Sequence, residues 1–171
     1  MALERLWAGW RSEYIDAVIG DGADRVDVCL FCALPDVEPD EALVIVRDQH
    51  AYAVLNAYPY TSGHLMVVPV RHVGELDDLR EDEARQVMTM TQHATTAIRA
   101  AYAPQGMNVG MNLGRAAGAG IPGHLHVHVL PRWAGDTNFL TSVAEARVMP
   151  EPLSKALERL RAAWPSTGAH S

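Results

Sequence analysis

The hydrophobic pattern of this chain predicts two helices. Apolar or small residues recur at intervals of three and four from 84 to 102, which is the spacing of one face of an amphipathic helix. Acidic residues within 77–83 precede this pattern and complement the helix dipole, and Pro104 ends it. The stretch 152–164 begins with a proline, a favoured first helical residue, and carries a shorter pattern of the same kind.

Runs of β-favouring residues predict an antiparallel sheet of about five strands. The runs are 43–47, 51–56, 64–70, 107–113 and 123–131. Short turns join the first three, so we expect a meander. A Gly-rich connection joins the last two, which are therefore expected to be antiparallel neighbours, with a face of small and amide residues beside the last strand. Up to residue 41 little regular structure is indicated. The expected fold class is α+β, with the long helix packed on the sheet and a C-terminal helix.

The last predicted strand carries three histidines that alternate with apolar residues. Side chains of a strand point to opposite faces in turn, so one face would hold His124, His126 and His128, and the other Leu125, Val127 and Val129. Burying several imidazoles requires several specific partners, which favours a functional role over core packing. Two chemistries are open at this point. His126 could act as a nucleophile tuned by its neighbours, or all three rings could bind a metal.

The two cysteines form a second candidate site. Cys29 and Cys32 are too close in sequence for an easy disulfide, and their spacing suits a tetrahedral Zn²⁺ site that needs two further ligands. His72 and His124 are the best candidates for those ligands. The alternative is a pair of buried thiols without a metal. A redox CxxC pair normally opens a helix after a strand, and the Ala-Leu-Pro that follows Cys32 argues against it.

Composition narrows the class of protein. The chain has 171 residues, which predicts a single globular domain, and a formal net charge of -7, which gives no field for holding a nucleic-acid polymer. No basic leader and no membrane-spanning apolar run are evident, so a cytoplasmic protein that does not bind membranes is expected. The Gly118-Ala119-Gly120 segment could present backbone N–H groups to a phosphate, although a Gly-rich loop alone is weak support.

Three segments are expected along the chain. Residues 1–28 form an N-terminal extension whose apolar stripe packs on the domain or on a partner. Residues 29–145 form the catalytic domain, and residues 146–171 form the C-terminal helix and a tail.

Several motifs occur together in an order that resembles the histidine triad (HIT) family of nucleotide-binding hydrolases and transferases. The histidine strand matches that family's signature of three histidines spaced by hydrophobic residues. The other matching blocks are Leu55–Pro69, Arg71–Leu76, Gly110–Gly114 and Pro131–Asp136. The segments Leu6–Arg11 and Arg132–Phe139 look most similar to the branch of fragile histidine triad hydrolases and bacterial diadenosine tetraphosphate phosphorylases. The resemblance covers Cys29 to about Phe139.

This resemblance implies a function and a role for each matching residue. His126 would attack the α-phosphorus of a dinucleoside polyphosphate and form a nucleotidyl-histidine intermediate, which water or inorganic phosphate resolves. His64 and His128 would assist around the phosphates. The implied substrate-binding residues are Asn56 at the ribose, Asn112 at the phosphate or leaving group, and the Gly118, Ala119 and Gly120 loop. The implied ligands of a structural zinc ion are Cys29, Cys32, His72 and His124, and the implied assembly is a homodimer.

The choice between hydrolysis and phosphorolysis stays open. Fragile histidine triad enzymes have Gln where this chain has Asn112, and the connection to the first histidine is one residue longer here. Two other functions also stay open. One is a nucleotide-binding sensor with incidental catalysis, and the other is a metalloenzyme that uses all three histidines as ligands.

Overall fold

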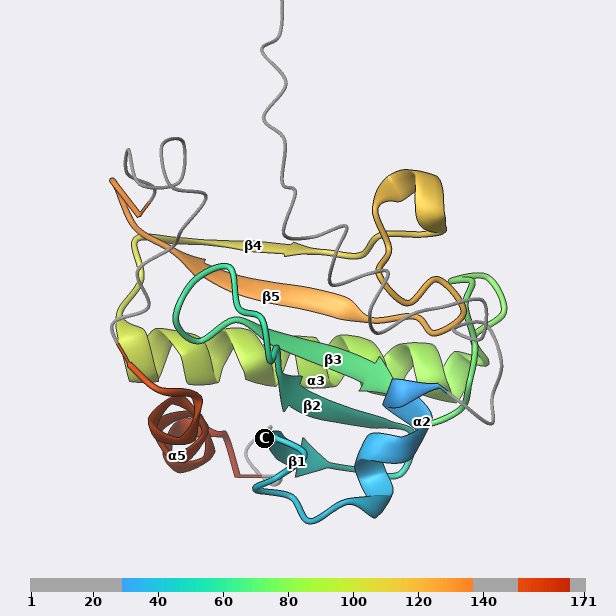
Figure 1. Ribbon diagram of the computed structural model, residues 1–171, viewed down its shortest axis with the longest axis horizontal. Coiled ribbons are helices and arrows are strands. Elements are labelled where there is room, and N and C mark those ends of the chain that lie inside the picture. The colour runs from blue at the N-terminus through green and yellow to red at the C-terminus, as the bar shows by residue number, and fades with distance from the viewer. Residues whose placement is uncertain (1–28, 137–150, 167–171) are drawn as a thin grey trace, which may run out of the picture.

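Five antiparallel strands form one sheet in the order β1-β2-β3-β5-β4 (Figure 1). The computed structural model describes residues 29–136 and 151–166. The strands are β1 (Val44–Arg47), β2 (Ala51–Leu55), β3 (Leu65–Pro69), β4 (Gly106–Gly110) and β5 (Val127–Arg132). The predicted α+β fold, the meander of the first three strands and the antiparallel pairing of the last two are confirmed.

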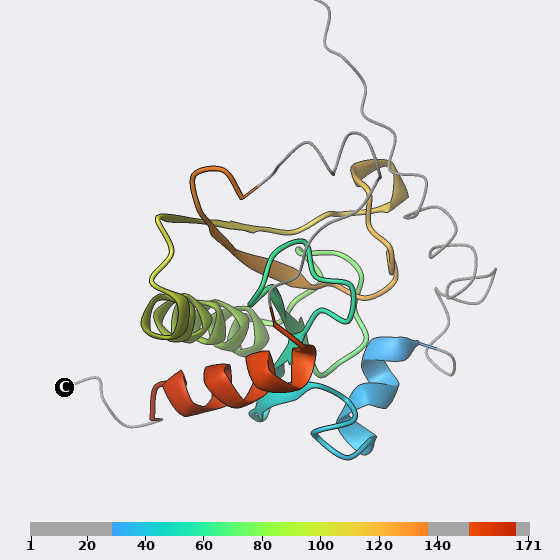
Figure 2. The same cartoon turned by 60° about the vertical axis from the view of Figure 1, so that its left-hand side comes forward.

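Helices cover both faces of this sheet (Figure 2). The long helix α3 (Glu81–Tyr102) and the C-terminal helix α5 (Leu153–Ala163) pack on one face. The short helix α2 (Leu30–Ala33) and the 3-10 turn η2 (Leu34–Asp36) lie on the other. A second 3-10 turn, η3 (Arg115–Ala117), lies in the connection from β4 to β5. The sheet is therefore the middle layer, which leaves its central strands little access to water.

Strand β2 shows why its sequence is apolar throughout. Every residue of β2 is buried. Ala51, Ala53 and Leu55 belong to the core beneath α3 and α5, whereas Tyr52 and Val54 belong to the cluster that contains Cys29 and Phe31. Burial of both faces removes the polar positions that a strand with one solvated face would carry.

The histidine segment differs from the predicted strand at its start. Strand β5 begins at Val127, so His124 and His126 precede the paired residues. The ladder between β3 and β5 ends with Val67 opposite Val127, and beyond it the Leu125 N–H donates to the Val73 carbonyl at 2.6 Å. The predicted division between faces still holds in β5, because Val127 and Val129 lie in the core beneath the helices and His128 does not.

The helix boundaries shift slightly from their predicted places. Helix α3 starts at Glu81 rather than 84, since acidic residues form its first turn. It ends at Tyr102, because the next residue, Ala103, adopts the left-handed backbone conformation with φ 45°. Helix α5 starts one residue after Pro152. The expectation of little regular structure up to residue 41 was wrong for residues 29–41, because α2 and η2 lie there.

Some predictions fall outside the described residues. The apolar stripe of the N-terminal extension lies within 1–28, and the segments 137–150 and 167–171 are likewise outside the described ranges. The proposed segment boundaries therefore stay predictions. Within residues 29–136 and 151–166, neither of the longer helices is both long and apolar enough to cross a membrane.

Candidate functional site

His64, at the start of β3, and His128 of β5 are joined by a hydrogen bond between their rings. The backbone N–H of Tyr60 donates to His64 Nδ1 at 3.2 Å, so the proton of a neutral His64 ring is on Nε2. Nε2 of His64 lies 3.0 Å from Nδ1 of His128 and donates to it. This arrangement assigns the proton of a neutral His128 to Nε2. The glycine before His64 has φ +79°, which lets the chain turn sharply into β3.

His126 is held as a neutral ring with one nitrogen available as a base or nucleophile. Its Nδ1 lies 2.8 Å from the carbonyl oxygen of His124, which can only accept, so Nδ1 carries the proton. Nε2 therefore keeps its lone pair. Burial lowers the pKa of His126 below 6.5, against the weaker opposite effect of the His124 carbonyl. Near neutral pH the neutral ring is consequently favoured. This is the form that can act as a nucleophile through Nε2.

A cavity of about 200 Å³ opens in front of these histidines. His126, His128 and Asn56 are among the polar residues that line it. Much of the remaining lining is apolar and comes from α2, η2, the turn before β1, the end of β2 and the Gly-rich connection, including Leu30, Phe31, Leu34, Ala42, Leu43, Val54 and Ile121. A mostly apolar cavity with a small number of polar groups in its lining is the usual form of a small-molecule site.

The predicted substrate-binding residues divide into two groups. Asn56 and Gly120 line the cavity, and Asn56 Oδ1 accepts the backbone N–H of Tyr58 at 2.9 Å. Asn112, Gly118 and Ala119 are not among the lining residues. The Asn112 amide instead donates to the Gly118 carbonyl at 3.4 Å, which ties the end of β4 to the Gly-rich loop.

The four predicted metal ligands come together in a second cluster. Their ligand atoms, from Cys29, Cys32, His72 and His124, all lie within 4.8 Å of one another. Nδ1 of His124 is 3.3 Å from Cys29 Sγ and 3.5 Å from Cys32 Sγ. Nδ1 of His72 is 3.3 Å from Cys32 Sγ. In a tetrahedral site with Zn–S of about 2.3 Å and Zn–N of about 2.0 Å, neighbouring ligand atoms are roughly 3.5 Å apart, so the cluster is positioned to bind such an ion.

The surroundings of the cluster favour a cation. His124 Nε2 donates to the Pro69 carbonyl at 2.9 Å, which leaves Nδ1 unprotonated and directed at the sulfurs. Burial lowers the pKa of His124 to about 4, so this ring is neutral near pH 7. Burial, with the neighbouring Cys29, raises the pKa of Cys32 to about 11, and a metal ion would offset this cost by stabilising the thiolate.

The metal cluster and the cavity both use histidines of the segment 124–128, but they use different ones. His124 faces the cysteines, whereas His126 and His128 face the cavity. The metal-binding group found in residues 29–136 and 151–166 includes neither His126 nor His128. This geometry does not favour the alternative in which all three histidines hold one metal ion.

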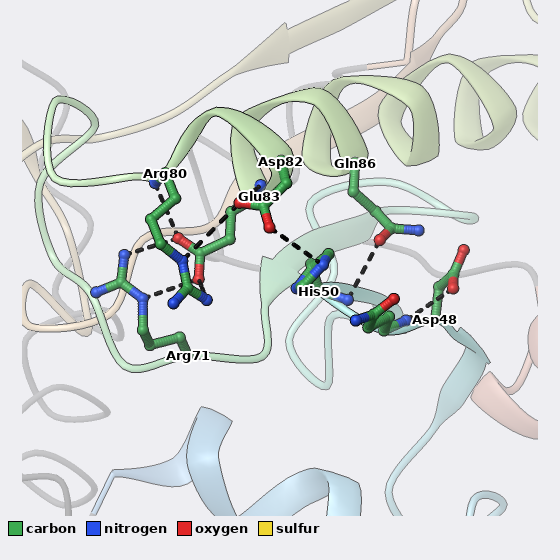
Figure 3. Close-up of polar contacts among 8 residues, drawn as sticks. Asp48, His50, Arg71, Arg80, Asp82, Glu83 and Gln86 are labelled. Carbon is green, nitrogen blue, oxygen red and sulfur yellow. Dashed lines mark hydrogen bonds and ion pairs between the residues drawn. The ribbon is translucent and has the colours of Figure 1, made fainter.

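A buried carboxylate fixes the loop that carries His72 (Figure 3). Glu83, in the first turn of α3, is only 1% exposed. Arg71 Nε and Nη2 donate to its two oxygens at 2.8 and 2.7 Å, and Arg80 donates through Nη2 at 2.7 Å and through its backbone N–H at 3.0 Å. Because Arg71 immediately precedes His72, this network anchors the metal-ligand loop to the start of α3.

Acid is expected to weaken this network. Its hydrogen bonds, above all those from Arg71, lower the pKa of Glu83 from 4.5 to about 2. The stabilisation is therefore complete above about pH 4.5 and is lost as the pH falls toward 2. Glu83→Gln should cost about 1 to 3 kcal/mol at pH 7, after allowance for water around the arginines, and should lose that part of the acid dependence. Urea unfolding at several pH values measures this, with exposed Glu81→Gln as the control. Equal acid dependence in wild type and Glu83→Gln would contradict it.

Sequence reasoning missed several residues of the site. The Phe31 ring lies with its centroid 5.5 Å from that of His124 and 5.0 Å from that of His126, between the two clusters. The Tyr52 hydroxyl donates to the Phe31 carbonyl at 2.7 Å and so holds α2 on the sheet. Tyr60 lies 4.7 Å from His64, measured between ring centroids. The position of Phe31 between the cysteines was a usable signal, whereas the tyrosine contacts depend on the folded sheet.

Comparison with known proteins gives consistent matches. A family model described as "HIT domain" matches residues 38–135. The chain is 42% identical over 165 residues to a protein of Mycobacterium tuberculosis named AP-4-A phosphorylase, covering 95% of this chain and 85% of the relative.

Solved structures show the same fold. A Zn-bound histidine triad family protein from Mycobacterium smegmatis matches with a TM-score of 0.65 and 29% identity, over 81% of this chain and 94% of that one. A hypothetical histidine triad nucleotide-binding protein from Sulfolobus tokodaii matches with a TM-score of 0.64 and 26% identity, over 79% and 91%. Together with the family model, which spans more than half of the sequence, these matches show that the chain belongs to the HIT domain family.

Proposed function

We propose that this protein transfers a nucleotidyl group from a dinucleoside polyphosphate such as diadenosine tetraphosphate to phosphate or water. The observation that carries the proposal is His126, a buried ring whose Nδ1 donates to a carbonyl, whose Nε2 keeps its lone pair, and which lines a mostly apolar cavity. The similarity to the M. tuberculosis protein named AP-4-A phosphorylase supports this substrate class.

In the proposed reaction His126 forms the covalent intermediate. Its Nε2 attacks the α-phosphorus, the bond from that phosphorus to the bridging oxygen breaks, and ATP leaves. Phosphate or water then attacks the same phosphorus, breaks the P–N bond and releases ADP or AMP, which returns His126 to its neutral form. Two displacements through an imidazole are each easier than one direct displacement.

The ring pair of His64 and His128 is proposed to donate a hydrogen bond to the phosphates. The Tyr60 N–H, His64 and His128 form one ordered series of hydrogen bonds that gives His128 an N–H at Nε2. A neutral donor held in advance stabilises developing negative charge without reorganisation during the reaction. Asn56 and Gly120, which line the same cavity, are proposed to contact the sugar and phosphates, with Asn112, Gly118 and Ala119 positioning the loop behind them.

The four-residue cluster is proposed to hold a structural zinc ion. Its ligands come from α2, from the loop after β3 and from the start of the histidine segment, so an ion there would connect three distant parts of the chain. A site with four protein ligands is closed, which is typical of structural rather than catalytic zinc. The Zn-bound relative from M. smegmatis supports the choice of metal.

A product assay with and without inorganic phosphate tests the proposed function. Diadenosine tetraphosphate should give ADP plus ATP by phosphorolysis or AMP plus ATP by hydrolysis, and the proportion with phosphate present decides between them. Tight nucleotide binding without turnover under either condition would instead support the sensor alternative. Absence of both binding and turnover would overturn the proposal.

A homodimer is proposed on the exposed edge of β4. This strand pairs with β5 on one side and, among the described residues, with no strand on the other. Val109 and Leu113, in and just after β4, are 49% and 40% exposed. An unpaired edge with exposed apolar side chains is suited to pairing with a second chain, and closed two-fold dimers are the commonest oligomers.

Light scattering after gel filtration checks the dimer. The wild-type protein should have twice the mass of one chain, and Val109→Glu should shift it toward a monomer because the new charge would be buried at the contact. Met88→Glu places the same charge on an exposed apolar residue of α3 and should leave the mass unchanged. A monomeric wild type would contradict the proposal.

A further inference from the structure

One wall of the cavity is a tight turn that precedes β1. Glu41, Ala42 and Leu43 all line the cavity from this turn. The end of β2 and the rings of His126 and His128 line the same cavity. The width of the apolar slot therefore depends on the conformation of the turn.

The turn includes a backbone conformation that leucine rarely adopts. Leu43 has φ 56°, in the left-handed region, where a side chain crowds the backbone. Such a residue persists when its surroundings impose the conformation. Hydrogen bonds within the sheet and turn do so in part: the Leu55 N–H donates to the Leu43 carbonyl at 3.0 Å, and the Val44 N–H donates to that of Pro39 at 2.9 Å.

A single arginine from the C-terminal helix holds both ends of this turn. Arg161 donates to the Val44 carbonyl through Nε at 3.2 Å and through Nη2 at 2.6 Å. Its Nη1 donates to the Asp40 carboxylate at 2.5 Å. Asp40 lies three residues before Leu43, and Val44 directly follows Leu43. The guanidinium therefore binds the chain on both sides of the residue with the left-handed conformation.

Helix α5 is itself firmly placed. Ala156, Leu157 and Leu160 are buried in the core shared with α3 and the sheet. The helix lies beside β1 at the edge of the sheet (Figures 1 and 2). A planar guanidinium with several fixed donors on a rigid helix can hold two acceptors in a set geometry, which a flexible ammonium does less well.

We propose that Arg161 is a positioning residue for the substrate cavity and that it sets the affinity for the nucleoside by holding the Asp40–Val44 turn as its wall. This inference rests on the proposed function, because it takes the cavity as the nucleoside site. Arg161 contacts neither His126 nor His128 in the structure, so its effect should fall on binding rather than on the chemical step. Nothing in the sequence pattern pointed to this residue.

Steady-state kinetics with diadenosine tetraphosphate, together with calorimetric binding of AMP, test the inference on the full chain. Arg161→Ala should raise KM and the Kd for AMP about tenfold and leave kcat within about twofold, since loss of charge-assisted hydrogen bonds releases the wall but not the histidines. Arg161→Lys, which keeps the charge and one contact, should recover part of the affinity. Lys155→Ala, an exposed cation on the same helix, should change neither value.

The outcomes separate a positioning role from a structural one. If Arg161 only stabilised the fold, Arg161→Ala would lower the melting temperature and the active fraction, hence the apparent kcat, with KM and Kd unchanged, and the inference would be overturned. Unchanged affinity in a fully folded Arg161→Ala protein would overturn it as well. A wild-type protein that neither binds AMP nor turns over the substrate would overturn the proposed function first and this inference with it.

Discussion

Replacing His126 by alanine is expected to lower turnover of diadenosine tetraphosphate by about a thousandfold or more, because removal of a nucleophile abolishes the two-step route. The fold should survive, since the hydrogen bond of this ring goes to a carbonyl of its own segment, that of His124. Rapid quench of the wild-type enzyme with labelled substrate should trap one nucleotidyl group on His126, and the variant should trap none.

His93→Ala is the matched control for this experiment. His93 lies on α3, outside the residues that line the cavity, and its replacement should leave turnover near the wild-type rate. If His126→Ala kept full turnover, the covalent mechanism would be wrong, and the search for the nucleophile would have to move to another residue of the cavity.

Replacing Cys29 by serine is expected to abolish binding of the proposed zinc ion and to lower the melting temperature by roughly 10 °C or more. Ligand atoms from three distant segments meet in this cluster, so a metal ion bound there would contribute directly to folding. Elemental analysis of the purified protein should find about one zinc per chain in the wild type and almost none in Cys29→Ser.

His126→Ala serves as the control for the metal site, because its zinc content should match the wild type. Loss of zinc in both variants would instead favour a site that uses the histidines jointly. A wild-type protein without zinc, even after refolding with the metal, would show that the cysteines are buried thiols.

Local patterns were sufficient for the elements of the fold. The helical periodicities over 84–102 and 152–164 and the β-favouring runs depend on neighbouring residues, so they predicted α3, α5 and the five strands within a few residues. Helix α2 was not predicted, because it is a single turn. The Tyr52 hydroxyl stabilises it by donating a hydrogen bond to the Phe31 carbonyl. Such short helices are stabilised by tertiary contacts rather than by their own sequence.

The metal cluster was predicted better than the cavity. The spacing of Cys29 and Cys32 and the family order of the motifs pointed to His72 and His124, and the four side chains do converge. The apolar wall was not predicted, because Leu30, Leu34 and Ile121 look like ordinary core residues in the sequence. Only the packing of α2 and the Gly-rich connection against the end of β2 makes them the lining of one cavity.

The sequence by itself determined the fold class and the family, and it named the side chains that are proposed to react and to bind a metal, because these inferences depend on residue type and short-range spacing. The family resemblance assigned His124 to the metal site and His126 and His128 to the phosphates, but only the tertiary structure decided how the backbone separates these rings. Val67 is the last residue of β3 paired with β5, so the chain at His124 is released from the ladder and its ring turns to the Pro69 carbonyl and the cysteines, while His126 and His128 face the cavity. The structure likewise decided the contact of Arg161 with Asp40 and Val44, since a hydrogen bond between residues more than a hundred positions apart exists only after the core has brought α5 beside β1.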